Sequence, residues 1–217
     1  MTDDELKREH TRLTAAGEIA AIIFHDLRSP LSIIKGYIDM LALKEGDVSK
    51  EKLKEISLVL SQQIETINQM AADSACFRES SPLVKRPISV PHIIDLVKHS
   101  APVNTSIADV PAVDIDVDAS LIERSLSAII RVLAGAGDVS VECRATDDAF
   151  SFVISAAGNA TDDNLSKMFT PLFVYGKRRG AGLALMCAKK AVLDHGGHVL
   201  VEQKDGRMIV TVILPLH

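Results

Sequence analysis

Apolar residues along the first forty positions recur at alternating steps of four and three. Eleven positions between residues 6 and 41 follow this spacing, and nine of them hold an apolar residue other than glycine. The eleven residues are Leu6, His10, Leu13, Gly17, Ala20, Phe24, Leu27, Leu31, Ile34, Ile38 and Leu41. Such a heptad seam is typical of a helix that packs lengthwise against another helix. It predicts a first helix over residues 3–44.

A second helical pattern follows Glu-Gly-Asp at residues 45–47, which interrupts the first. Ser49 is a suitable N-cap, and the pattern predicts a helix over residues 50–77. One stripe of this helix is apolar, namely Leu53, Ile56, Leu60, Ile64, Ile67 and Ala71. A single helical hairpin cannot bury both stripes, so we expect two copies to form a four-helix bundle with two-fold symmetry. The alternative is that the hairpin packs onto the C-terminal half of its own chain.

The pattern changes after a polar linker at residues 78–91, which contains three prolines. Helices are predicted at 92–99, 120–133 and 182–195, and extended segments at 110–117, 139–144, 150–154, 199–203 and 208–214. Mixed helices and strands of this kind predict an α/β sandwich with a mixed sheet. The expected fold is therefore α+β, with a helical hairpin in a domain of residues 1–80 and a sandwich in a domain of residues 81–217.

Charge, hydropathy and cysteine content narrow the classes of function. The formal net charge of −5 and the lack of a basic run argue against a nucleic-acid partner. No apolar stretch approaches the roughly 20 residues that span a bilayer, and we find no signal peptide. The three widely spaced cysteines, Cys76, Cys143 and Cys187, are interpreted as reduced thiols without a metal site. These features predict a cytoplasmic protein that is not in the membrane.

The candidate chemistry lies within the first helix, at His25-Asp26-Leu27-Arg28-Ser29-Pro30-Leu31. His25 follows the seam position Phe24 and should therefore face water. A neutral imidazole is a competent nucleophile near neutral pH. The adjacent carboxylate of Asp26 can hold the other ring N–H or take its proton. We predict a reactive histidine here, the alternative being an ordinary surface histidine on a coiled coil.

This segment resembles the phosphoacceptor box of bacterial sensor histidine kinases, His-Glu/Asp-x-Arg-Thr/Ser-Pro-Leu. The resemblance implies that His25 accepts a phosphoryl group and that the catalytic set is His25, Asp26, Arg28, Ser29 and Pro30. Small residues on the same exposed face would let a partner approach the helix closely, and two larger residues flank them. The predicted partner-binding residues are Ser32, Ile33, Gly36 and Tyr37.

Three later segments are similar to the ATP-binding domain of the same kinases, a GHKL-type or Bergerat α/β sandwich. They are Met-Phe-Thr-Pro-Leu-Phe at 168–173, Gly-Ala-Gly-Leu-Ala-Leu at 180–185 and Asp-His-Gly-Gly at 194–197. Their order and spacing are similar to those of the family. The resemblance implies that residues 81–217 adopt that fold in a degenerate form.

The polar residues that hold nucleotide in that family are missing. The family carries an asparagine on its nucleotide helix, but residues 120–133 contain none, and Ser127 and Arg131 are the nearest equivalents. The family's adenine-binding aspartate falls on Ser155 or Ala156, neither of which has a carboxylate. A relic nucleotide loop remains in three glycines, Gly158, Gly180 and Gly182. We therefore expect no effective ATP binding, no bound cofactor and no metal site in this chain.

An intact acceptor helix beside a degenerate nucleotide domain predicts a histidine phosphotransferase of a two-component phosphorelay. The implied partners are response regulator receiver domains, an upstream (hybrid) histidine kinase and a second copy of the chain, with Mg²⁺ supplied by the receiver. Three alternatives stay open: a divergent active sensor histidine kinase, a pseudokinase adaptor, and a phosphatase for a response regulator in which Ser29 positions the attacking water.

Overall fold

The computed structural model describes residues 3–43, 48–74, 83–108, 110–158, 165, 167–170 and 181–216. The chain divides into two compact units, Met1–Ala75 and Cys76–His217. The expected boundary between residues 80 and 81 lies outside the described residues.

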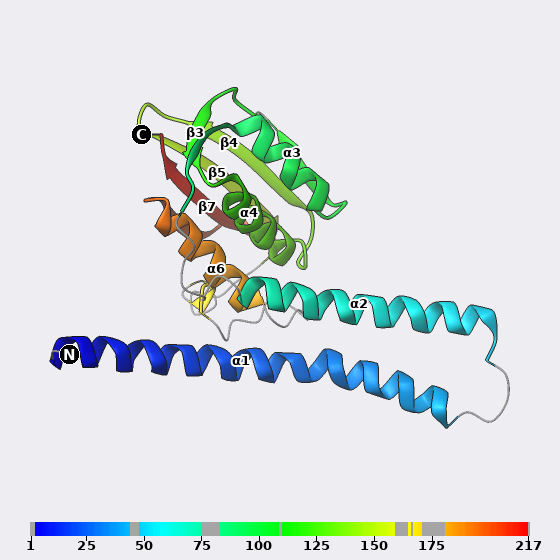
Figure 1. Ribbon diagram of the computed structural model, residues 1–217. Helices are drawn as coiled ribbons and strands as arrows, with labels where there is room; N and C mark the ends of the chain where they lie inside the picture. Colours follow the sequence, from blue (N-terminus) through cyan, green and yellow to red (C-terminus); the bar gives the residue numbers. More distant parts are fainter. Residues whose placement is uncertain are drawn as a thin grey trace. The chain divides into compact units, whose positions relative to one another are not determined.

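The first unit is a hairpin of two helices that lie side by side, α1 (Asp3–Ala42) and α2 (Lys50–Ser74) (Figure 1). The helix α1 continues through Pro30, which is buried. Both helices fall where the apolar periodicity predicts them. The second helix is described only to Ser74, so its expected last turn lies outside the described residues.

The apolar seam of α1 is only partly covered within the hairpin. Three seam residues seven positions apart, Phe24, Leu31 and Ile38, are 67%, 53% and 54% exposed. The intervening seam residues Leu27 and Ile34 are half-buried. On α2, two stripe residues are exposed as well, Leu53 and Ile64. The hairpin therefore leaves an apolar stripe uncovered.

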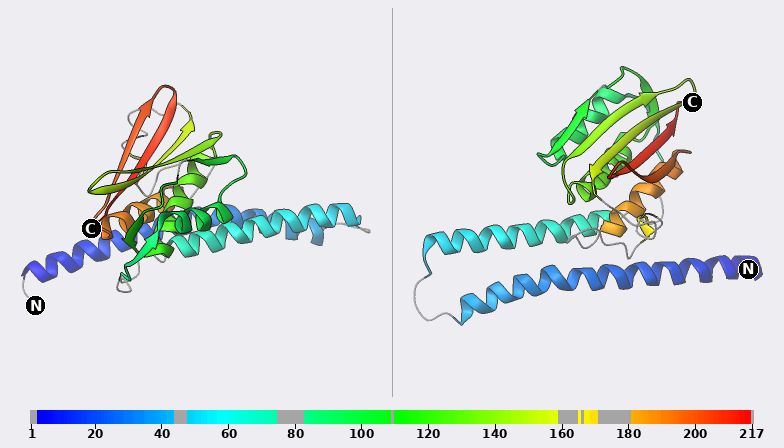
Figure 2. Two further views of the ribbon diagram at one scale, coloured as in Figure 1. Left: turned by 90° about the horizontal axis from the view of Figure 1, so that it is seen from above. Right: turned by 180° about the vertical axis from the view of Figure 1, so that it is seen from behind.

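The second unit is built on a five-stranded mixed sheet with the strand order β2-β4-β5-β7-β6. Its strands are β2 (Thr105–Ala108), β4 (Val139–Ala145), β5 (Ala149–Ala157), β6 (His198–Lys204) and β7 (Arg207–Pro215). The pair β2–β4 is parallel, and the other three pairs are antiparallel. Three helices cover one face of the sheet, α3 (Val90–Ser100), α4 (Ala119–Leu133) and α6 (Ala181–Asp194) (Figure 2). The expected α+β fold with a mixed sheet is confirmed.

Two short strands were not expected from the sequence. β1 (Arg86–Ser89) lies in the segment interpreted as linker and pairs antiparallel with β3 (Asp114–Val117) in a separate two-stranded sheet. Pro87 is tolerated there because a two-stranded sheet consists only of edge strands. β2 has four residues, two of them hydroxylic, so it carries little hydrophobic signal. β3 is also shorter than the extended segment predicted at 110–117.

Strict alternation along β5 separates an inner from an outer face of the main sheet. Phe150, Phe152, Ile154 and Ala156 are each 0% exposed and belong to the core under the helices. The intervening residues therefore point to the outer face, as successive side chains of a strand do. β7 alternates in the same way, with Met208, Val210, Val212 and Leu214 in the core.

The His-Gly-Gly segment after α6 is held by its own contacts. The buried side chain of His195 accepts the backbone N–H of Asp118 at Nε2 (2.9 Å), and its Nδ1 lies 2.6 Å from the carbonyl oxygen of Ala191. Gly196 has a φ of 80°, which a residue with a side chain rarely adopts. A Cβ on Gly197 would lie 2.2 Å from the carbonyl oxygen of Ile213. The motif therefore joins α4, α6 and β7 without any ligand.

The cysteines differ from the expectation. Cys143 is a free and buried thiol, and burial raises its pKa to about 11. Cys187 is disulfide-bonded, so the interpretation of all three cysteines as reduced thiols was wrong. Three cysteines can form one disulfide and leave one free thiol. An odd number of cysteines therefore does not show that all of them are reduced.

Candidate functional site

His25 lies on α1 with its imidazole open to solvent. The side chain is 68% exposed, and its Nδ1 lies 3.2 Å from Oδ1 of Asp26, whose side chain is 18% exposed. When Nδ1 carries the proton, it donates to this carboxylate, and the lone pair of Nε2 remains available for attack. No hydrogen bond to Nε2 is found among the described residues. The arrangement fits a nucleophilic imidazole oriented by a carboxylate.

The other predicted residues of the acceptor helix surround His25 on α1. Positions 25, 29, 32 and 36 follow helical spacing and so share one face. Ser32 and Gly36 are exposed, Ser29 is half-buried, and a Cβ on Gly36 would meet nothing within 4 Å. The remaining members are Arg28 and Ile33, which are exposed, Tyr37, which is half-buried, and Pro30, which is buried. Small side chains thus leave the backbone of this face accessible to a partner.

The structure decides which residue of β5 occupies the position of the family's aspartate. Ala156 points to the inner face and is 0% exposed, whereas Ser155 points to the outer face and bonds Ser140 and Arg207. Of the two candidates, Ala156 is the one on the face that the helices cover, and we take it as the equivalent of the family's aspartate. A methyl group cannot bond the adenine amino group.

Ser127 on α4 is also unsuited to hold a metal ion. Its hydroxyl is buried, donates to Oε1 of Glu123 (2.9 Å) and lies 2.7 Å from the hydroxyl of Ser100, at the end of α3. These bonds turn it toward α3 and occupy it. Arg131, the other candidate from the sequence, is half-buried one turn later.

The remaining glycines of the predicted nucleotide loop have structural roles where they are described. The N–H of Gly158 donates to the carbonyl oxygen of Gly206 (3.1 Å), and its own carbonyl accepts the side-chain amide of Gln203 (2.8 Å). Gly182 is buried in the first turn of α6. Gly180 lies outside the described residues. ATP with its Mg²⁺ is the ligand that this fold implies, and the residues at 127 and 156 do not fit it.

The described residues contain neither a candidate metal centre nor a candidate membrane span. No group of three or more His, Cys, Asp and Glu side chains is placed to hold a metal ion within the described ranges. Among the described helices, none has the length and apolar character of a membrane span. The sequence analysis did miss one polar cluster, around Arg207 on the outer face of the sheet, because its members come from three strands.

Comparison with known proteins identifies the family that the chain resembles. Residues 119–217 match the family of histidine kinase-, DNA gyrase B- and HSP90-like ATPases. Over nearly its whole length the chain is similar to histidine kinases. It is 25% identical over 232 residues to sporulation kinase E of Bacillus subtilis (98% of this chain and 30% of that one). It is also 25% identical over 229 residues to the sensor histidine kinase ZraS of Salmonella typhimurium (98% and 48%). This histidine kinase-like protein thus spans about a third to a half of the length of these relatives.

Solved structures show the same fold over both units. Histidine kinase ThkA, solved in complex with the response regulator protein TrrA, aligns with a TM-score of 0.74 over 99% of this chain and 66% of that one, at 17% identity. Acinetobacter baumannii histidine kinase AdeS aligns with a TM-score of 0.67 over 89% of this chain and 98% of that one, at 17% identity. The expected family resemblance is confirmed for the hairpin and for the sandwich.

Proposed function

We propose that this histidine kinase-like protein is a histidine phosphotransferase of a two-component phosphorelay. The single observation that carries the proposal is the contrast between two positions. His25 is exposed beside a carboxylate, whereas Ala156 fills the adenine-facing position of a domain that otherwise keeps the kinase fold. The acceptor chemistry is present, and the chemistry for binding the donor ATP is missing. The phosphoryl donor is therefore another protein.

The transfer proceeds in two steps in which His25 is the nucleophile and carries the phosphoryl group. Nε2 attacks the phosphorus of a phospho-aspartate on a first receiver domain. The P–N bond forms as the P–O bond breaks, and the aspartate leaves as a carboxylate. A carboxylate of a second receiver then attacks the phosphohistidine and restores the free imidazole. Each receiver supplies the Mg²⁺ that neutralises the transferring phosphoryl group.

Asp26 stabilises the charge that develops on the ring. As Nε2 bonds to phosphorus, the imidazole becomes cationic, and the Nδ1 proton lies 3.2 Å from the Asp26 carboxylate. A hydrogen bond to an ionised group is worth about 1.5–3 kcal/mol. Asp26 also fixes the tautomer, because only a ring protonated at Nδ1 leaves Nε2 free for attack.

The absence of a carboxylate at position 156 supports the proposal that ATP is not an effective donor. Losing a charge-assisted hydrogen bond costs about 1.5–3 kcal/mol. Mutating a residue that only hydrogen-bonds to a metal ligand already lowers metal affinity by roughly 10–100-fold. Losing a metal ligand itself should lower it by at least as much. Together these losses weaken ATP binding by on the order of 10²- to 10⁴-fold.

The uncovered stripe of α1 supports a homodimer. Phe24, Leu31 and Ile38 form an apolar row that the hairpin alone does not bury. A second copy can cover it in a four-helix bundle with two-fold symmetry.

Receivers would then dock on the face of α1 that carries Ser29, Ser32 and Gly36, flanked by Ile33 and Tyr37. The response regulator bound to ThkA supports a receiver as the class of partner. We place the phosphorelay in the cytoplasm, with a hybrid histidine kinase upstream.

The test offers the purified protein two donors in parallel. One reaction contains radiolabelled ATP and Mg²⁺, and the other contains a labelled phospho-receiver. Label should reach the wild type only from the receiver and should not reach His25→Gln. His92→Gln removes an exposed histidine of the second unit and serves as the matched control, which should label like the wild type.

Other outcomes would assign one of the alternative functions. Labelling of His25 by ATP alone would make the chain an active kinase. Loss of label from the receiver as free phosphate, with sensitivity to Ser29→Ala, would make it a phosphatase. Receiver binding without any transfer would leave an adaptor.

A further inference from the structure

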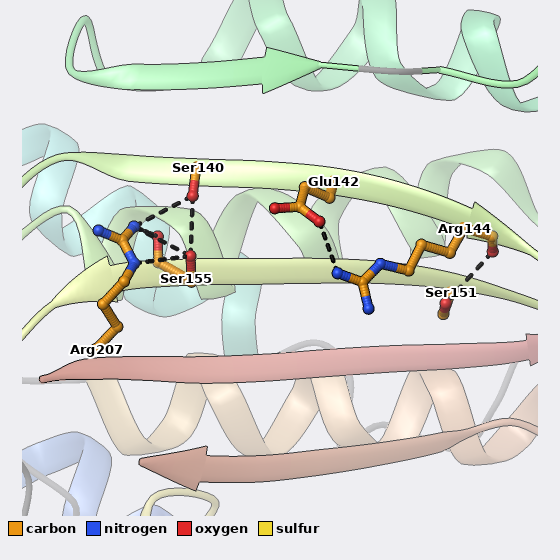
Figure 3. Close-up of polar contacts among 6 residues, drawn as sticks. All are labelled: Ser140, Glu142, Arg144, Ser151, Ser155 and Arg207. Carbon is orange, nitrogen blue, oxygen red and sulfur yellow. Dashed lines mark hydrogen bonds and ion pairs between the residues drawn. The ribbon is translucent and has the colours of Figure 1, made fainter. Parts of the chain in front are cut away.

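One arginine on the outer face of the sheet has no counter-charge among the residues that the structure describes. Arg207, at the start of β7, donates from Nε to the hydroxyl of Ser155 (3.2 Å). Its Nη2 donates to the hydroxyl of Ser140 (3.1 Å) and to the hydroxyl (3.0 Å) and carbonyl oxygen (3.1 Å) of Ser155 (Figure 3). All these acceptors are neutral. The ion pairs found among the described residues do not include Arg207.

A neighbouring arginine on the same face has its charge compensated by a carboxylate. Arg144 on β4 pairs with Glu142, two residues before it, with 2.7 Å between Nη2 and Oε2 (Figure 3). Both side chains are more than half exposed, so this pair needs no further ligand. Arg207 is half-buried and lacks such a partner, although a less exposed charge needs compensation more.

A second cation lies directly opposite Arg207. In the β6–β7 pairing, Lys204 is the register partner of Arg207, so both side chains project from the same face. Lys204 is exposed and also absent from the ion pairs of the described residues. Two carboxylates are near in sequence, Asp205 in the turn and Glu202 on the same strand, but neither forms an ion pair with the two cations. Like charges directly opposite each other destabilise a sheet unless an anion joins them.

The serine hydroxyls complete a set of donors. The hydroxyls of Ser140 and Ser155 lie 2.9 Å apart and share one hydrogen bond. Two hydroxyls carry two protons, so one proton remains for a further acceptor. The Nη1 group of Arg207 likewise has no partner among the described residues. Donors of a guanidinium, an ammonium and a hydroxyl thus lie on one face where β5 and β6 end and β7 begins, next to the β6–β7 turn.

We propose that Arg207, Lys204, Ser140 and Ser155 bind a phosphate group on the outer face of the sheet. The two cations carry a combined charge of +2, which matches the charge of about −1.5 to −2 on a phosphate monoester near pH 7. A single carboxylate would leave one cation uncompensated. The site lies on the face of the sheet opposite the helices. It is therefore separate from the degenerate nucleotide region, and the inference does not depend on the proposed phosphotransfer.

The test follows the Arg207 side chain in the full-length protein. The Nε–H signals of ¹⁵N-labelled arginine are recorded during titration with inorganic phosphate, and Arg207→Gln identifies its signal by loss. Potassium acetate and potassium chloride at equal ionic strength are the comparison titrants. The Arg207 signal should shift saturably with phosphate and much less with the other two. Equal responses to acetate and phosphate, or no response to phosphate above chloride, would overturn the proposal.

Variants locate the site. Because a charge-assisted hydrogen bond is lost, Arg207→Gln should raise the dissociation constant for phosphate at least about 10-fold, measured by calorimetry. Lys204→Gln should weaken binding as well, and since Lys204 is exposed, this variant tests the site even where Arg207→Gln alters the fold. Arg144→Gln is the matched control and should change binding less than about 2-fold. Equal effects of Arg144→Gln and Arg207→Gln would reject the site.

A gain-of-charge variant gives the converse test. Ala157 is the register partner of Arg207 on β5 and is exposed, so Ala157→Asp places a carboxylate directly opposite the guanidinium. The new carboxylate should form an ion pair with Arg207, as Glu142 does with Arg144, and should therefore abolish phosphate binding. Undiminished binding in Ala157→Asp would contradict the proposed position.

A second ligand distinguishes whether the site binds a phosphate ester or free inorganic phosphate. Ile209 is the register partner of Ser155 and Val153 lies two residues before Ser155, so the two adjoin the cluster on the same face and form a short apolar strip. An ester whose apolar group lies on this strip should gain affinity, so phenyl phosphate is compared with inorganic phosphate. Tighter binding of phenyl phosphate assigns the site to a phosphate ester, and tighter binding of inorganic phosphate assigns it to the free ion.

Discussion

The exposed face of α1 around His25 and the inner face of β5 differ in the chemistry that they present. Around His25, an imidazole, a carboxylate and small side chains are arranged at a surface where a partner can reach them. At Ala156, the position that would meet adenine is apolar and completely buried. The two regions differ in what they require. A phosphoacceptor needs one helix and two adjacent residues, whereas a nucleotide site needs a pocket that stays open against the tendency of a core to fill.

The largest expected effect tests whether the uncovered apolar row of α1 is an interface between two copies. Ile38→Asp places a charge in the uncovered apolar row. Burial of an isoleucine contributes about 1.5–3 kcal/mol, and each dimer contains two copies. The dissociation constant of the dimer should therefore rise by about 100-fold or more, measured by sedimentation equilibrium. Leu58→Asp is the control, because Leu58 is 62% exposed on α2 but lies outside the apolar stripe. A dimer that tolerates Ile38→Asp would contradict the bundle.

The next effect tests whether the inner face is closed. Ala156→Asp restores a carboxylate at the family's position, but it buries that group without a partner. The free energy of unfolding should fall by about 3 kcal/mol, measured by urea denaturation, and ATP binding should not return. Ala157→Asp, one residue later on the outer face, should leave stability nearly unchanged. Measurable ATP binding by Ala156→Asp with undiminished stability would show an open pocket.

A smaller effect tests the structural explanation of the His-Gly-Gly segment. Gly197→Ala introduces a Cβ that would lie 2.2 Å from the carbonyl oxygen of Ile213. Relief of this overlap should lower the free energy of unfolding by about 2 kcal/mol. At Gly137 the nearest atom to an added Cβ is 3.8 Å away, so Gly137→Ala should be tolerated. Both are compared by thermal and urea unfolding, and equal stability of the two variants would remove the packing explanation.

The smallest effect on stability sharpens the functional side of the comparison. Gly36→Ala adds a methyl group to the exposed face below His25 with no atom within 4 Å. Alanine favours a helix over glycine by about 0.8–1 kcal/mol, so the hairpin should become slightly more stable. Transfer from a phospho-receiver should nevertheless slow, because the partner can no longer approach the backbone closely.

Gly17→Ala, at an equally open position of α1, is the matched control. It should show the same gain in stability without the loss in transfer rate. Equal transfer rates in both variants would separate Gly36 from the docking surface.

Sequence patterns predicted the parts of this molecule that depend on local spacing. The heptad seam predicted α1, and the box around His25 predicted the exposure of the imidazole and its contact with Asp26. The assignment of Ser155 and Ala156 stayed open, although the alternation from Phe150 onward carries the answer once Ala156 is included in the strand. The cluster of Ser140, Ser155 and Arg207 was unpredictable, because strand register joins residues 67 positions apart. Four-residue strands such as β1 also lack enough periodicity to be recognised.

Complete burial of Ala156 has an evolutionary consequence. In the genetic code, some alanine codons differ from an aspartate codon by a single base, so aspartate can arise at this position in one mutation where such a codon is used. That variant would bury an unpaired carboxylate and lose stability. Selection for folding would therefore act against an aspartate at position 156, whatever ligand the domain binds.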